Sequence, residues 1–211
     1  MTTLPRQGCD GWWRFFQALT EVAAEKAVEA AARFQQGRLR YAVGSPLSED
    51  PGLATALSDE VQRTIRDEGL DAPAVVLVDH GSPSPLVTAE RDRMADSLRA
   101  SLPGGLVASV TAASMERRPG DEYAFCKPLL ENCLPYVGDG VGHVVLCLMF
   151  LLPGTHAGPQ GDIDQICEAA LRDAGVERRV VKTRLVGELD GLVQVLGRRH
   201  DDALARLRAA S

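Results

Sequence analysis

Residues 74–82, AVVLVDHGS, constrain the fold of this chain more than any other stretch. A largely β-branched apolar run ends there in a polar turn that carries His80. A short unbroken apolar run bounded by turn residues is typical of a strand buried on both faces, as in a parallel sheet. Residues 143–152, HVVLCLMFLL, repeat the pattern and lead into a turn that carries His156. Because ligands bind at the carboxyl ends of strands in open α/β sheets, we expect both imidazoles to face one crevice.

The rest of the chain alternates segments with helical and strand-like patterns. This alternation predicts an α/β fold, a parallel sheet flanked by helices and joined by right-handed crossovers. Further strands are expected at 38–43, 106–113 and 180–185, and helices at 12–36, 53–68, 84–102, 121–137 (with a kink or a start at Pro128), 161–174 and 192–209.

Two segments, 27–53 and 166–192, share an order of helix, basic turn, short strand, glycine-containing loop and helix start. One interpretation is a duplication. Residues 1–70 would then be a partial, N-terminally truncated first α/β half, and residues 71–211 a complete domain. The other interpretation is that any two helix–strand–helix units look alike.

Composition excludes several classes of protein. The formal net charge of −6 argues against a general nucleic-acid surface. The longest apolar run, 144–152, is far shorter than the roughly 20 residues of a membrane helix, and no secretory signal pattern opens the chain. Five widely spaced cysteines argue against a disulfide framework. We therefore expect a cytoplasmic protein that binds neither nucleic acid nor membrane.

Three side chains are candidates for chemistry. His80 and His156 follow two predicted strands, and Glu116 follows a third. Two imidazoles and a carboxylate suit divalent ions such as Co²⁺, Fe²⁺, Ni²⁺ or Zn²⁺, and they leave coordination positions open, so that the metal can exchange. The alternatives are capped turn histidines and a solvated Glu116 paired with Arg117 or Arg118.

Other reactive residue types are expected to be structural. His143 opens a strand, and His200 lies among charges in the last helix. Cys126 and Cys133 are seven residues apart, and an iron–sulfur cluster would need two more cysteines, so buried thiols are the expectation. Ser82 lacks the G-x-S-x-G setting of a nucleophile.

Three motifs in order resemble the class II chelatases of the CbiX and sirohydrochlorin chelatase type. They are V-D-H-G-S after the first buried strand, M-E after the second, and F-L-x-P-G-x-H followed by Asp-Ile. The resemblance covers residues 74–192 and implies a flavodoxin-like chelatase half-domain. The family's two histidines fall on His80 and His156, its acidic residue on Glu116, and its Asp-Ile on Asp162 and Ile163.

The resemblance implies an enzyme that inserts Co²⁺ or Fe²⁺ into sirohydrochlorin, on the way to cobalamin or sirohaem. The divalent metal is then a substrate, with Ni²⁺ and Zn²⁺ as further candidates. His80, His156 and Glu116 are its expected ligands and the candidate bases for the pyrrole protons. An anionic tetrapyrrole needs polar and cationic partners, for which the candidates are Ser82, Arg117, Arg118 and Lys127, with Arg91 and Arg93 as further cations or ordinary surface charges.

An alternative function is a chelatase-fold protein without turnover, which carries metal or tetrapyrrole or stabilises a partner. The two histidines favour the enzyme. Pro83, where the family usually has arginine, and the short first half favour the alternative. A missing wall of the cleft could come from a second copy, so a homo-oligomer is left open.

Overall fold

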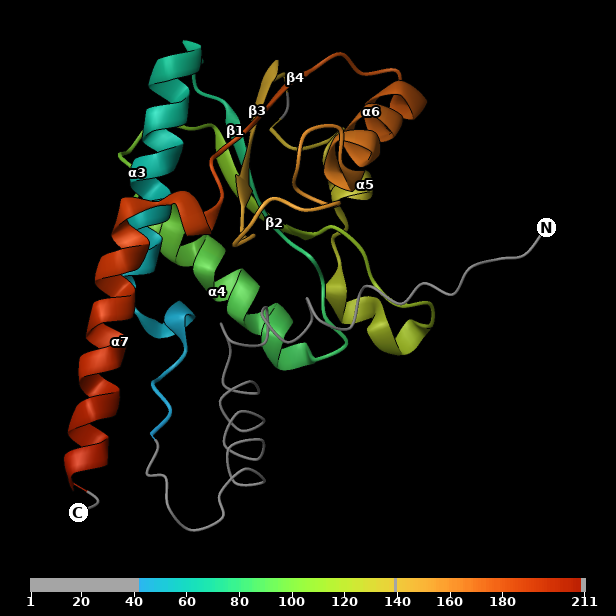
Figure 1. Ribbon diagram of the computed structural model, residues 1–211. Coiled ribbons are helices and arrows are strands. Elements are labelled where there is room, and N and C mark those ends of the chain that lie inside the picture. The colour runs from blue at the N-terminus through green and yellow to red at the C-terminus, as the bar shows by residue number, and fades with distance from the viewer. Residues whose placement is uncertain (1–41, 139, 210–211) are drawn as a thin grey trace. The chain divides into compact units, whose positions relative to one another are not determined.

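The computed structural model describes residues 42–138 and 140–209, which contain a parallel sheet of four strands (Figure 1). The strands lie in the order β2-β1-β3-β4, and all three pairings are parallel. Their bounds are β1 (Ala74–Asp79), β2 (Ser109–Ser114), β3 (His143–Leu148) and β4 (Arg179–Lys182). The α/β fold predicted from the alternating pattern is confirmed.

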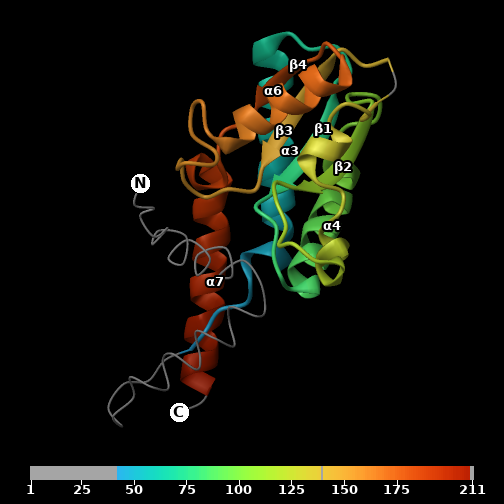
Figure 2. The same cartoon turned by 90° about the vertical axis from the view of Figure 1, so that its right-hand side faces the viewer.

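Helices cover both faces of the sheet (Figure 2). The helices α3 and α4 pack together against one face, and α5 and α6 pack together on the other. The α-helices are α3 (Pro51–Glu68), α4 (Pro85–Ser101), α5 (Leu130–Cys133), α6 (Asp162–Ala174) and α7 (Asp190–Ala209), and short 3-10 helices are η2 (Leu47–Glu49), η3 (Asp121–Cys126) and η4 (Val186–Glu188).

The two central strands form the core, as their apolar sequences predict. Every residue of β1 is buried, and in β3 only His143 is partly accessible. Burial on both faces requires helices on both sides, which explains why these strands are apolar throughout rather than alternating. Each fully buried leucine contributes on the order of 2 kcal/mol of transfer free energy, and α3 adds Leu53 and Leu57 to this core.

The connections that follow β1 and β3 lead to opposite faces of the sheet. After β1 the chain runs into α4 on one face, and after β3 it runs into α6 on the other. Loops that leave neighbouring parallel strands in opposite directions open a crevice at the carboxyl edge, where open α/β sheets bind ligands. His80 and His156 lie in these two loops.

One predicted helix is wrong. The segment 121–137 forms the 3-10 helix η3, an extended turn with a cis Lys127–Pro128 bond, and the four-residue α5. Pro128 has no N–H to donate within a helix, and its carbonyl instead accepts from Ser114 N at 3.0 Å. The turn is therefore held against the end of β2. The remaining helices and strands between residues 51 and 209 agree with the predictions apart from their ends.

Residues 42 and 43, the described part of the strand predicted at 38–43, are not in a strand. The helix predicted at 12–36 lies outside the described residues. The proposed duplication and the division at residue 70 stay predictions for the same reason. No helix within the described ranges has both the length and the apolar character needed to cross a bilayer.

The chain divides into two compact units, Pro51–Val193 and a second that includes residues 42–50 and 194–209 of the described part. In the second unit, the Arg198 guanidinium donates to both carboxylate oxygens of Asp50, at 3.0 and 2.8 Å. Arg206 donates to Ser45 Oγ at 2.7 Å. These bonds hold the segment before α3 to the second half of α7.

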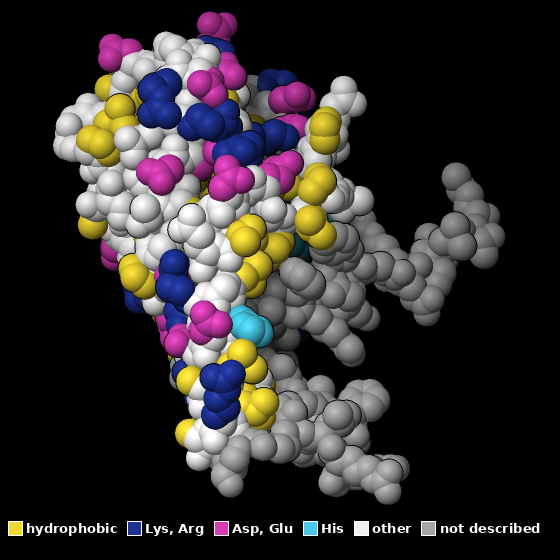
Figure 3. Space-filling model, turned by 60° about the vertical axis from the view of Figure 1, so that its left-hand side comes forward, with side chains coloured by type: hydrophobic (Ala, Val, Ile, Leu, Met, Phe, Trp, Pro, Cys, Tyr) yellow, Lys and Arg dark blue, Asp and Glu magenta, His cyan; other side chains and the backbone are white. Residues whose placement is uncertain are grey.

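A buried carboxylate joins α3 to the segment after β4. Glu60 on α3 is 2 % exposed and accepts from the backbone N and the guanidinium of Arg184, at 2.9 to 3.0 Å, and from the Arg63 guanidinium. Burial acts to raise the pKa of Glu60, but the hydrogen bonds from Arg63 and Arg184 outweigh it and lower the pKa from 4.5 to about 2. In Figure 3, basic and acidic side chains lie side by side in the upper part of the view.

Candidate functional site

Two histidine rings meet at the carboxyl edge of the sheet. His80 follows β1 directly, and His156 lies in the loop between β3 and α6. Their ring centroids are 4.9 Å apart and the ring planes make an angle of 75°. The side chain of His80 is 18 % exposed and that of His156 is 28 % exposed. Both rings are therefore shielded on most sides but still accessible to a small ion.

Glu116 lies next to His80 because backbone hydrogen bonds continue between the two segments that follow β1 and β2. Met115 N donates to Asp79 O at 2.8 Å, and Glu116 N donates to His80 O at 3.2 Å. The loops can approach because residue 81 is glycine: its φ is +94°, and a Cβ there would lie 1.9 Å from the Glu116 carbonyl oxygen. As a result, Nε2 of His80 lies 3.5 Å from Oε1 of Glu116.

The surroundings of His80 favour a cation between the ring and the carboxylate. Nδ1 of His80 lies 3.3 Å from the Gly81 carbonyl, which only accepts, so Nδ1 carries the proton. Burial lowers the pKa of His80 and outweighs the opposing effect of the Glu116 charge. In the neutral ring with its proton on Nδ1, the lone pair of Nε2 points toward a carboxylate oxygen. Two ligands at about 2.1 Å from one tetrahedral ion are about 3.4 Å apart, close to the observed separation.

The loop that carries His156 folds back onto the start of α6. Nδ1 of His156 lies 2.6 Å from Oδ2 of Asp162. Asp162 N donates to Thr155 O at 3.0 Å, and Ile163 N donates to His156 O at 3.1 Å. The close approach requires glycine at residue 161, where a Cβ would lie 2.6 Å from the carbonyl oxygens of Thr155 and His156.

A buried charged network lies under the first loop. Ser114 Oγ donates to Asp79 Oδ1 at 2.7 Å and accepts from Arg91 Nη1 at 2.6 Å. Burial raises the pKa of Asp79 to about 6, although Ser114 and Arg91 act to lower it. The Arg91 side chain also donates to the carbonyl oxygens of Cys126 and Lys127. Arg91 is 4 % exposed, so it is not the exposed cation that the sequence suggested.

The loop after β2 presents basic side chains beside Glu116. Arg117 is half-buried and donates to the carbonyls of Arg118 and Gly120, at 3.0 and 2.8 Å, so its guanidinium shapes the loop. Arg118 and Lys127 are exposed. Of these three predicted substrate cations, Arg118 and Lys127 are the more accessible.

Ser82, also predicted to bind the substrate, is buried at 8 % exposure. Its hydroxyl oxygen accepts from Ser84 N at 3.1 Å, and its carbonyl accepts from the Cys126 thiol at 3.0 Å. Both bonds fix the turn between His80 and α4. The bond from Cys126, which comes from a segment 44 residues away, could not be predicted from the sequence.

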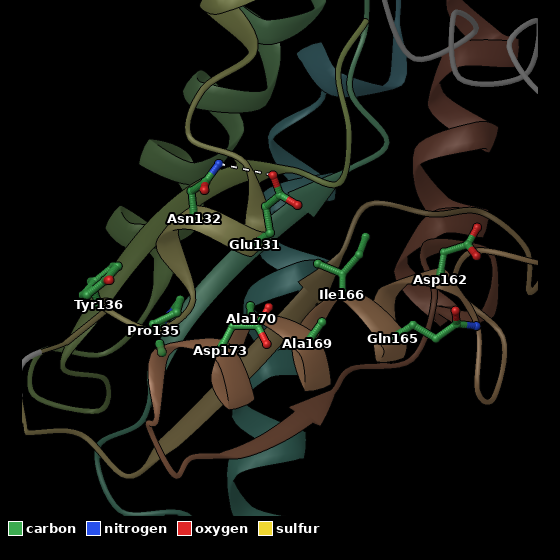
Figure 4. A pocket seen from close by; sticks show the side chains of 11 residues that line it. Glu131, Asn132, Pro135, Tyr136, Asp162, Gln165, Ile166, Ala169, Ala170 and Asp173 are labelled. Atoms are coloured by element: carbon green, nitrogen blue, oxygen red, sulfur yellow. Dashed lines mark hydrogen bonds between the residues drawn. The ribbon is translucent and has the colours of Figure 1, made fainter. Parts of the chain in front are cut away.

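A groove with a volume of about 600 Å³ lies between α5 and α6, with Asp162 at one end and Tyr136 at the other (Figure 4). Its floor is apolar, with Ile166 and Ala169, and its acidic side chains include Asp173. The groove therefore meets the histidine site at Asp162, the carboxylate that bonds to His156.

The site has fewer ligands than a permanent metal centre. In the part of the chain that the structure describes, no three His, Cys, Asp or Glu side chains are gathered closely enough to enclose a metal ion. His143 is half-buried at the start of β3, and His200 is exposed beside Asp201. Cys126, Cys133, Cys147 and Cys167 are free thiols. Among the described residues, His80 lies close to the two other predicted ligands, His156 and Glu116, but the three do not enclose a common position for an ion.

No protein-family model matches this chain, and no curated protein sequence does. Among solved structures, SirB from Bacillus subtilis with Fe³⁺ has a TM-score of 0.60 and 18 % identity, covering 92 % of this chain and 69 % of that one. CbiX, the terminal enzyme for biosynthesis of sirohaem in denitrifying bacteria, has a TM-score of 0.58 and 16 % identity, and the similarity covers 86 % of this chain and 70 % of the CbiX chain.

DR2241 from Deinococcus radiodurans, a multi-domain protein with structural similarity to chelatases, has a TM-score of 0.59 and 18 % identity. That similarity covers 89 % of this chain and 39 % of DR2241. At such low identity the likeness concerns the fold. The chain therefore has the fold of the class II chelatases that its three motifs resemble.

Proposed function

We propose that this protein inserts a divalent metal ion, Co²⁺ or Fe²⁺, into sirohydrochlorin or a related tetrapyrrole. The observation that carries the proposal is the pair of imidazoles, with ring centroids 4.9 Å apart, in the loops that follow β1 and β3. Oε1 of Glu116 lies 3.5 Å from Nε2 of His80 beside them. The chelatase fold of the neighbouring structures supports it.

His80, His156 and Glu116 bind the incoming metal in this proposal. Neutral imidazoles bind borderline divalent ions without closing the coordination sphere, so the ion can leave again. Glu116 is 59 % exposed, and its Oε1 lies 3.5 Å from Nε2 of His80, a separation at which both atoms can bind one ion. An incomplete ligand set suits a metal that is a substrate, because a closed four-ligand site would retain it.

The reaction exchanges protons for metal. The free macrocycle loses two pyrrole N–H protons and gains one divalent ion, so charge balances when two protons leave. Glu116 is a suitable first acceptor because it is the most exposed of the three metal ligands. The anionic side chains of the tetrapyrrole would bind Arg118 and Lys127, the accessible cations on the same loop and beside it.

The test is metallation in solution. The protein is mixed under anaerobic conditions with sirohydrochlorin and Co²⁺ or Fe²⁺, and the absorption spectrum is followed. We expect a rate well above that of the same mixture without protein. Binding of metal without any acceleration would reject the enzyme and favour the alternative, a protein that carries metal or tetrapyrrole or stabilises a partner.

Variants test which residues hold the metal. His80→Ala and His156→Ala should each weaken Co²⁺ binding by about tenfold or more, the loss of one metal–imidazole bond. His200→Ala is the matched control, since His200 is 68 % exposed and lies in α7. Equal losses in all three variants would mean that binding comes from surface histidines in general.

A further inference from the structure

The His156 ring is bonded to a carboxylate. Its Nδ1 lies 2.6 Å from Oδ2 of Asp162, and a carboxylate oxygen only accepts. The proton of the ring therefore lies on Nδ1. In the neutral ring Nε2 then has a free lone pair, which is the form of imidazole that binds a metal ion.

We propose that Asp162 is a positioning residue, which holds His156 in the Nδ1-protonated tautomer and keeps its Nε2 available for a divalent metal ion. The tautomer follows from the hydrogen bond alone. The effect on metal binding rests on the proposed function. Carboxylates bonded to metal-binding histidines also increase the basicity of the ligand.

The local fold supports this role because α6 holds both the ring and the backbone of His156. Asp162 is the first residue of α6, and Ile163, the second, donates its N–H to the His156 carbonyl at 3.1 Å. Gly161 permits the contact, since a Cβ there would clash with that carbonyl. The Nδ1 of His156 can therefore bond to another partner only if the ring first breaks its hydrogen bond to Asp162.

The two histidines differ in this respect. Nδ1 of His80 is bonded to a main-chain carbonyl, that of Gly81, at 3.3 Å, which no side-chain substitution removes. The Nδ1 bond of His156, in contrast, depends on a charged side chain. Removing the Asp162 carboxylate should therefore change the tautomer of the His156 ring and leave the Nδ1 bond of the His80 ring in place.

Asp164 offers a matched control. It lies in the same first turn of α6 and pairs with Lys182 at 2.7 Å rather than with a histidine. Asp164→Ala therefore removes the same charge from the same helix end without a direct bond to His156. The Asp162 side chain is 49 % exposed, so Asp162→Ala leaves no buried cavity.

The experiment is ¹⁵N NMR of the full chain with labelled histidines, in which the two ring nitrogens report the tautomer directly. We expect neutral His156 to be protonated on Nδ1 in the unsubstituted protein and in Asp164→Ala, and to lose that preference in Asp162→Ala. An unchanged tautomer in Asp162→Ala, or an equal change in Asp164→Ala, would overturn the proposal.

Metal titration gives the second measurement. Co²⁺ should bind Asp162→Ala about 10- to 100-fold more weakly than the unsubstituted protein, and Asp164→Ala within about threefold of it. Asp162→Asn keeps the shape of the side chain without its charge and should also bind more weakly, which covers the case of an alanine variant that misfolds. If the unsubstituted protein binds no Co²⁺, the proposed function fails while the NMR result still decides the tautomer.

Discussion

Gly81→Ala should separate the two loops that bring His80 and Glu116 together. Residue 81 has φ of +94°, which costs an L-residue about 1–2 kcal/mol. In addition, the new Cβ would lie 1.9 Å from the Glu116 carbonyl oxygen, whereas real Cβ contacts are rarely shorter than 3.0 Å. The carbonyl would have to retreat by about 1 Å, and the bond from Glu116 N to His80 O would break, at about 1 kcal/mol.

Gly105→Ala isolates the cost of the backbone conformation. Gly105 has a similar φ of +80°, but a Cβ there would meet nothing within 4 Å. With about 2–4 °C of melting temperature per kcal/mol for a domain of this size, we expect a loss of about 5 °C for Gly105→Ala and about 8 °C for Gly81→Ala. Co²⁺ affinity should fall only in Gly81→Ala.

Calorimetry of both variants, with Co²⁺ titration, makes the comparison. Similar melting temperatures for the two variants would refute the reasoning, because a Cβ at residue 81 meets Glu116 and Ser114 whereas a Cβ at residue 105 meets nothing within 4 Å. Equal Co²⁺ affinity in Gly81→Ala and the unsubstituted protein would show that the spacing of His80 and Glu116 does not matter for binding.

Three further predictions concern charged residues. The pKa of Glu60 is lowered from 4.5 to about 2, so ionised Glu60 stabilises the folded state by about 3 kcal/mol above pH 4.5, and this contribution is lost as the pH falls toward 2. In urea unfolding, Glu60→Gln should therefore be less stable than the unsubstituted protein at pH 7, and its stability should depend less on pH in the acid range. Parallel curves of stability against pH for the two proteins would contradict this. Arg91→Met should cost about 3–5 kcal/mol in the same assay, because it removes the buried guanidinium that donates to Ser114 Oγ, the partner of Asp79, and to the carbonyls of Cys126 and Lys127; a loss below about 1 kcal/mol would show that Arg91 is not structural. Arg118→Glu with Lys127→Glu should raise KM for the tetrapyrrole about tenfold with little change in kcat, as expected for cations that attract an anion, and an unchanged KM would exclude them from binding.

Local patterns were enough to predict the sheet and the meeting of the histidines. The unbroken apolar runs of β1 and β3 require burial on both faces, and strands of that kind end at one edge of a parallel sheet. The turn residues then place His80 and His156 on neighbouring loops. The prediction needed only the order of the segments along the chain, because His80 directly follows β1 and His156 lies in the loop after β3.

Contacts between distant segments could not be predicted in the same way. Arg91 resembles other helix-surface arginines in sequence, and only the folded chain brings its guanidinium to Ser114 and to the Cys126 carbonyl. The segment 121–137 has a helical composition, but Pro128 bonds to the end of β2 instead. The Asp162–His156 bond depends on a loop whose shape is set by close approach at Gly161.

The margins of the sheet have a consequence for how the protein behaves at high concentration. Within the described residues, β4 has a neighbour on one side only, and it is four residues long with a cation at each end, Arg179 and Lys182. On the other side, the end of β2 is capped by a bridge from Ser114 to Leu129. A short, charged edge is a poor template for the strands of other molecules, so the β4 edge disfavours the strand-to-strand pairing from which fibres grow.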